Sequence, residues 1–160
     1  LSIPFILPTS KVAPVNKAVE RCKELCYFFG KKKINVIRIG LQSTDTICNP
    51  SNQGSEVVAG PYHETFRQLV ESAMYYDMIV EKIKKFNTKV KEVEIRVNPQ
   101  TVNNVVGYKR QNIEKLKEFY DLDVIVKQDI KYPAEKFDVT ITKEYKDYLE
   151  EDDRILTIKK

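Results

Sequence analysis

Long hydrophobic runs are absent from this sequence of 160 residues. No stretch approaches the roughly 18 consecutive apolar residues that a membrane-spanning helix needs, so we expect no transmembrane segment and no membrane partner. Cysteine is also scarce, because the chain holds only three. An odd and low number argues against a disulfide scaffold and is typical of a reducing compartment, which predicts a cytoplasmic protein.

The sequence also lacks most motifs of common enzyme chemistry. His63 is the only histidine, and its place at the expected start of a helix favours a capping or surface role over that of a catalytic base. No pair of carboxylates stands apart from the general charged surface. Neither a dinucleotide-binding nor a Walker spacing is found at the glycines Gly40, Gly54, Gly60 and Gly107. We therefore predict no catalytic residue and no metal ligand.

What is present is the composition of a soluble globular chain, with 42% apolar and 31% charged residues. The length suits one ordinary domain or two small ones. A net charge of +4 is mild, so any binding of RNA or DNA has to depend on a local basic site. Residues 1–7 lack a leading Met and the features of a signal peptide, which leads us to expect a piece of a longer protein.

The first half of the chain has a helix–strand rhythm. Apolar residues recur every three or four positions over residues 13–29, which predicts an amphipathic helix that ends near Gly30. Residues 34–41 are rich in β-branched side chains and almost continuously apolar, which predicts a strand covered on both faces. Residues 42–61 have the composition of a long loop, and residues 62–86 that of a helix that packs on a sheet.

The next part has a β-α-α-β pattern. Alternation of apolar and polar residues predicts a strand over residues 90–97. Two short helices are predicted over residues 100–106 and 111–120, with Gly107 between them. A strand over residues 122–127 follows.

The end of the chain returns to strand-like alternation. It predicts a strand over residues 137–142 and a short last strand over residues 155–158, with an acidic, solvated stretch over residues 144–153 between them. The fold class is therefore α/β (α+β). We place one region at residues 1–86 and a second at residues 87–160.

Cys22 and Cys26 lie four residues apart in the first predicted helix. An iron–sulfur cluster that binds S-adenosylmethionine is typically held by Cys-x3-Cys-x2-Cys, and Phe29 occupies the position of the third thiolate. Both cysteines fall on the apolar stripe of the helix, so ordinary core cysteines are the favoured interpretation. Cys48 stands alone in the predicted loop.

The segment Val105–Ile113, with the sequence VVGYKRQNI, is more informative. Its place between two short helices in β-α-α-β order resembles KH domains, in which a Gly-x-x-Gly loop meets the RNA backbone. Arg110 replaces the second glycine, so its side chain either hinders close approach of the backbone or supplies a phosphate contact together with Lys109. Tyr108 is available to stack on a base. The RNA-binding residues that this resemblance implies are Gly107, Tyr108, Lys109, Arg110 and Asn112.

Two other stretches resemble the C-terminal region of radical S-adenosylmethionine iron–sulfur enzymes related to the catalytic subunit of Elongator. They are VIRIGLQST at residues 36–44 and VVAGPYHETFRQLVES at residues 57–72, which is similar to that family's Ala-Gly-Pro-x-His segment. The resemblance implies the trailing βα elements of a partial barrel, followed by the KH-like segment. It also implies a 4Fe-4S cluster and S-adenosylmethionine in a parent protein, held by an N-terminal part outside this chain.

Three hypotheses for function remain. In the first, the chain is the cluster-less C-terminal part of such an oxidoreductase, and it recognises substrate and closes the active site of the N-terminal radical part. Strand C-termini face the active site in barrels, so Arg38 and Gln42 would lie near the substrate or cofactor mouth, although Arg38 fits equally well as an internal charge partner. In the second, a KH-like module binds RNA or tRNA without catalysis. In the third, the module has lost RNA binding and braces another part of the same polypeptide.

Overall fold

The computed structural model describes residues 13–40 and 63–145 of the chain. Within them the protein is mixed α/β, with four helices and a three-stranded sheet that contains one parallel and one antiparallel strand pair. The chain divides into two compact units, Leu1–Val70 and Glu71–Lys160. This division falls inside the second helix, whereas the boundary expected from the sequence lies at the far end of that helix, at residue 86.

Several sequence predictions lie outside the described residues. They are the loop over residues 42–61, the strand over residues 155–158, most of the acidic stretch over residues 144–153, and the side chains of Gln42 and Cys48.

The first unit contains helix α1, Val15–Lys31, and the first turn of α2, Phe66–Lys84. The helix predicted over residues 13–29 is therefore confirmed. Pro14 precedes its first turn in an extended conformation, where a residue without a backbone N–H is well tolerated.

The prediction of a strand over residues 34–41 is wrong, because residues 34–39 have no regular secondary structure. Ile34 is 53% exposed and Ile37 is 89% exposed, so the expectation that both faces are covered is wrong as well. β-branched residues favour a strand only where a neighbouring strand completes the hydrogen-bonded ladder. The described part of this unit contains no such strand.

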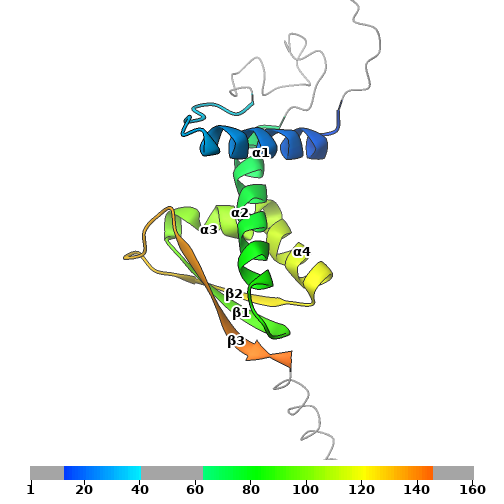
Figure 1. Cartoon of the computed structure of the whole chain (residues 1–160), viewed down its shortest axis with the longest axis vertical. Coiled ribbons are helices and arrows are strands. Elements are labelled where there is room, and N and C mark those ends of the chain that lie inside the picture. Colours follow the sequence, from blue (N-terminus) through cyan, green and yellow to red (C-terminus); the bar gives the residue numbers. More distant parts are fainter. Residues whose placement is uncertain (1–12, 41–62, 146–160) are drawn as a thin grey trace, which may run out of the picture. The chain divides into compact units, whose positions relative to one another are not determined.

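The second unit contains the remaining turns of α2 and the whole sheet. The further elements are β1 Val90–Val97, α3 Val102–Val106, α4 Gln111–Tyr120, β2 Asp123–Gln128 and β3 Phe137–Glu144. Short 3-10 turns at Pro99–Thr101 and Tyr108–Arg110 precede and follow α3. The order β1-α3-α4-β2 confirms the predicted β-α-α-β pattern (Figure 1).

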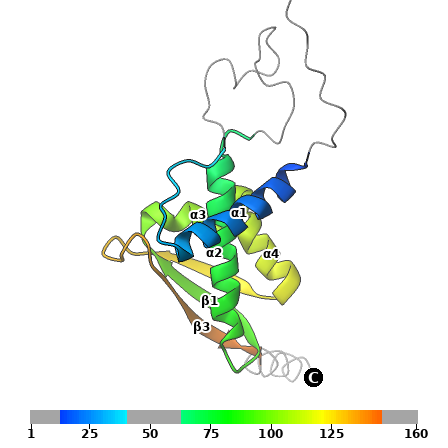
Figure 2. The same cartoon turned by 45° about the horizontal axis from the view of Figure 1, so that its top comes forward.

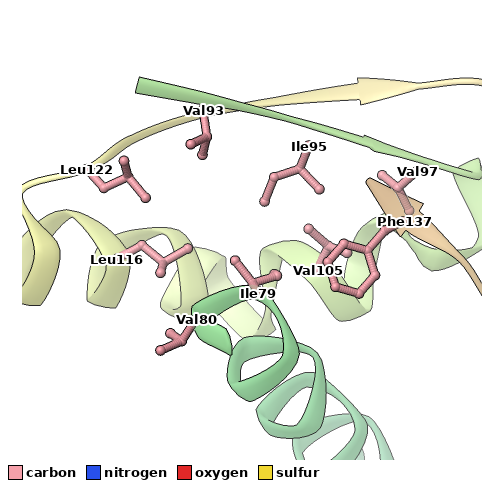
Figure 3. Packing of buried hydrophobic residues seen from close by; sticks show 9 residues of the cluster. All are labelled: Ile79, Val80, Val93, Ile95, Val97, Val105, Leu116, Leu122 and Phe137. Carbon is pink, nitrogen blue, oxygen red and sulfur yellow. The ribbon is translucent and has the colours of Figure 1, made fainter. Parts of the chain in front are cut away.

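The sheet has the strand order β2-β1-β3, with β1 parallel to β2 and antiparallel to β3. Ile95 in the central strand lies opposite Val126 on one side and Val139 on the other. In both views α3 and α4 flank α2 (Figures 1 and 2). Figure 3 shows that the helices cover a single face of the sheet.

The core lies between that face and the helices. Alternation along β1 turns Val93, Ile95 and Val97 inward, and all three are fully buried. Figure 3 shows them facing Ile79 of α2 and Leu116 of α4, which are fully buried too. At about 25 cal/mol per Å² of apolar surface removed from water, burial of each such side chain stabilises the unit by roughly 1.5–3 kcal/mol. The sheet and α4 therefore form a rigid base for the loop that precedes α4.

Candidate nucleic-acid interface

The loop between α3 and α4 is built on backbone conformations with positive φ. Gly107 ends α3 with φ +82° and ψ 163°, a region that is essentially restricted to glycine. Lys109 and Arg110 follow with φ +50° and +65°. The left-handed region costs a residue that has a side chain about 1–2 kcal/mol. Two adjacent residues of this kind persist only where the surrounding structure holds them in place.

The loop is held from beneath by Asn112, which lies in the first turn of α4 and is 3% exposed. Its side-chain Nδ2 lies 2.9 Å from the carbonyl oxygen and 3.0 Å from the Oγ of Ser72 on α2. The same nitrogen lies 3.2 Å from each of the carbonyl oxygens of Asn104 and Val105 on α3. One amide nitrogen has two hydrogens, so these four acceptors share its donors in three-centre bonds. This single side chain links α2, α3 and α4.

Asn112 therefore does not present its side chain at the surface. The sequence predicts that Asn112 contacts RNA. In the structure its side chain is buried and holds the loop in position. Gly107 packs directly against it, since a Cβ at Gly107 would lie 2.9 Å from Cγ of Asn112 and 3.0 Å from its backbone nitrogen.

Tyr108, Lys109 and Arg110 form the outer side of the loop. Tyr108 is 45% exposed, and both basic residues are exposed. The Nζ of Lys109 lies 5.4 Å from the centroid of the Tyr108 ring, within the distance at which a cation is attracted to an aromatic face. Within residues 13–40 and 63–145, no carboxylate forms an ion pair with Lys109 or Arg110.

On the outer face of the sheet, by contrast, the basic side chains pair with a carboxylate. The Nζ of Lys127 lies 2.7 Å from Glu94 Oε2, and Arg96 Nη2 lies 3.5 Å from Glu94 Oε1. The hydrogen bond from Lys127, with a smaller contribution from Arg96, holds the pKa of Glu94 below its ordinary value. Cations that already face a carboxylate have less charge to offer a phosphate. Lys109 and Arg110 of the loop therefore differ from Lys127 and Arg96 of the sheet face, which share the carboxylate of Glu94.

Of the two residues predicted at a substrate mouth, the structure describes Arg38. Arg38 is exposed on the irregular segment 34–39, and Gln42 lies outside the described residues. The neighbouring carbonyl of Ile37 accepts a hydrogen bond of 3.0 Å from Nη1 of Arg67.

The structure also describes the histidine and two of the cysteines that the sequence offered as candidates, His63, Cys22 and Cys26. The backbone N–H of Thr65 donates to Nδ1 of His63 at 3.1 Å, in the turn just before α2 begins. Cys22 and Cys26 are half-buried residues of α1. The part of the chain that the structure describes contains no group of three or more potential metal ligands. Of its helices, none combines the length and the apolarity needed to cross a membrane.

Sequence reasoning missed Ser72, the partner of Asn112 on α2. It is 6% exposed and lies 40 positions away in sequence, so no local pattern connects the two. One signal was available for Asn112 itself. It precedes Leu116 by four residues and so shares the buried face of α4.

Comparisons with protein-family models, with curated proteins and with solved structures find no match to this chain.

Proposed function

We propose that the second unit of this chain binds single-stranded RNA through the loop Gly107–Arg110. One observation supports the proposal above all. Two adjacent exposed cations, which no carboxylate among the described residues neutralises, stand beside an exposed aromatic ring on a loop fixed from beneath. Basic and aromatic side chains together suit a phosphate backbone and a base. The resemblance of the β-α-α-β segment to KH domains agrees with this proposal.

Each side chain of the loop has a task in this proposal. Arg110 and Lys109 contact phosphate oxygens, which fixes the strand in position without reading its sequence. The ring of Tyr108 stacks on a base, which requires a base that no neighbour covers. The ligand is therefore an unpaired segment of RNA, as found in a loop or at an end.

The double variant Lys109→Ala with Arg110→Ala tests this function. We expect it to bind a single-stranded RNA oligonucleotide, or tRNA, at least about tenfold more weakly at low salt, because two phosphate contacts are lost. The slope of log K against log salt should fall by about 1.4, since each contact to a single strand contributes about 0.7. Filter binding of the whole chain over a salt series measures both quantities.

A matched control removes the same charge elsewhere. Lys131 and Lys136 are exposed residues of the β2–β3 connection, and their joint replacement by alanine should change the affinity by about twofold at most. Equal losses in the two double variants, or no binding by the unaltered chain at low salt, would contradict RNA binding at this loop.

We also propose that the chain belongs to a radical S-adenosylmethionine enzyme and shapes its active site. The two stretches at residues 36–44 and 57–72 support this. Arg38 and Gln42 stay candidates for the mouth of that active site, and the cluster and S-adenosylmethionine would belong to the parent protein.

The coding sequence upstream of Leu1 tests this second proposal. We expect a Cys-x3-Cys-x2-Cys motif there, and we expect residues 34–39 to exchange their amide hydrogens far more slowly in the longer protein than in this chain, because strand pairing protects them. Absence of the three cysteines, or equally fast exchange in both proteins, would exclude it.

A further inference from the structure

The sequence leaves open whether Arg110 obstructs the loop or contacts the ligand. Resting on the proposed RNA binding, we infer that this loop recognises phosphate through the guanidinium of Arg110 and not through the backbone N–H groups of Gly107, Arg110 and Gln111. Arg110 is then the residue that determines how the strand is held.

The first support comes from the backbone donors of the loop. The N–H of Gly107 donates to the carbonyl of Asn103 at 2.9 Å, and the N–H of Arg110 donates to the carbonyl of Gly107 at 3.1 Å. The N–H of Gln111 donates to the carbonyl of Tyr108. A phosphate could use these donors only by breaking bonds that the loop already makes. The backbone at positions 107, 110 and 111 is therefore committed to the fold.

The second support comes from the space around Gly107. A glycine in a phosphate-binding loop usually leaves room for a ligand to reach the backbone. Here the place of a Cβ is occupied from inside, with Cγ of Asn112 at 2.9 Å and Oγ of Ser72 at 3.0 Å. Gly107 is therefore explained by the packing of the loop on Asn112, and it does not require a ligand.

The third support is that Lys109 and Arg110 differ in their side-chain contacts. The ammonium of Lys109 already lies over the ring of Tyr108. Arg110 makes no side-chain hydrogen bond, ion pair or ring contact with the described residues. Its guanidinium offers a planar set of five donors that fits two oxygens of one phosphate, which an ammonium cannot match.

The backbone at Arg110 agrees with this assignment. With φ +65° and ψ 16°, the residue holds a conformation that glycine adopts without strain. A side chain that conflicts locally with its backbone is expected at functional positions. The side chain of Arg110 therefore does not stabilise the loop, which agrees with a role in binding the ligand.

The variant Arg110→Gly separates the two modes of recognition, since it restores a Gly-x-x-Gly loop. We expect a single-stranded RNA oligonucleotide to bind about fivefold more weakly or worse, and the salt slope to fall by about 0.7. The urea midpoint of the variant should equal or exceed that of the unaltered chain, because the left-handed strain is relieved. Arg110→Lys should keep the salt slope and recover only part of the affinity.

The possible results are distinguishable. Unchanged or tighter binding by Arg110→Gly would overturn the inference in favour of backbone recognition, and the proposed RNA binding would stand. A lower urea midpoint would assign Arg110 a structural role and would also overturn the inference. If the unaltered chain does not bind RNA at low salt, the proposed function itself fails. Lys131→Ala, with the same loss of charge, should show neither the weaker binding nor the smaller slope.

Discussion

Replacement of Gly107 by alanine is expected to destabilise the second unit by about 3 kcal/mol or more. Two effects add. The conformation at φ +82° and ψ 163° costs a residue with a side chain about 1–3 kcal/mol. The new Cβ would also lie 3.0 Å from the backbone nitrogen of Asn112. Because that atom is part of α4, it cannot swing aside as the end of a flexible side chain can. Urea unfolding followed by circular dichroism measures the change.

The same substitution at Gly30 serves as the control. Gly30 lies in the last turn of α1, and apart from its chain neighbours and the backbone of its own helix, no heavy atom lies within 4 Å of the place that its Cβ would take. Alanine should stabilise this helix by up to about 1 kcal/mol, because it loses less backbone freedom on folding than glycine. A Gly107→Ala variant as stable as the unaltered chain would contradict the loop geometry described above.

Replacement of Asn112 by alanine is the second change with a large expected effect, a loss of about 2–4 kcal/mol. The side chain removed is 3% exposed. Its loss leaves the carbonyls of Ser72, Asn104 and Val105 without the amide donor they share. Ser72 lies within α2 and its carbonyl keeps the helical donor, whereas Asn104 and Val105 lie in the last turn of α3, where carbonyls have no intrahelical donor. Buried acceptors without donors are costly, because water that would satisfy them in the unfolded chain does not reach them in the fold.

Asn103 provides a matched control on the neighbouring helix. It is an exposed residue of α3, and its replacement by alanine should change the free energy of unfolding by about 0.5 kcal/mol at most. If the Asn112→Ala and Asn103→Ala variants unfold at the same urea concentration, Asn112 does not link the three helices. Asn112→Ala should in addition weaken RNA binding, because the loop loses its support.

Local periodicity was sufficient to predict the helices and strands from β1 to β3. The alternation of Val93, Ile95 and Val97 identified the buried face of β1, since a strand turns successive side chains to opposite faces. The same reasoning placed α4 at its observed bounds, residues 111–120, and located Gly107 between the helices. Each of these patterns is carried by residues close together in the chain, so no distant partner is needed to recognise it.

Features that depend on distant partners were not predictable. Residues 34–41 have the composition of a strand, but a strand needs a neighbour, and the described residues of the first unit provide none. The burial of Asn112 depends on Ser72, 40 positions earlier. The composition of the loop suggested Tyr108, Lys109 and Arg110 as candidate residues. It did not reveal their left-handed backbone, because local propensity at Lys109 and Arg110 opposes that conformation.

Backbone amide shifts on titration with a short single-stranded RNA show whether the loop Gly107–Arg110 binds RNA. The isotope-labelled whole chain is titrated at low salt, and the amide signals are followed by nuclear magnetic resonance. The largest shifts are expected at residues 107–113, on and just after the loop. Shifts centred on α1 or on the outer sheet face around Glu94 and Lys127, or no shifts at all, would contradict this binding.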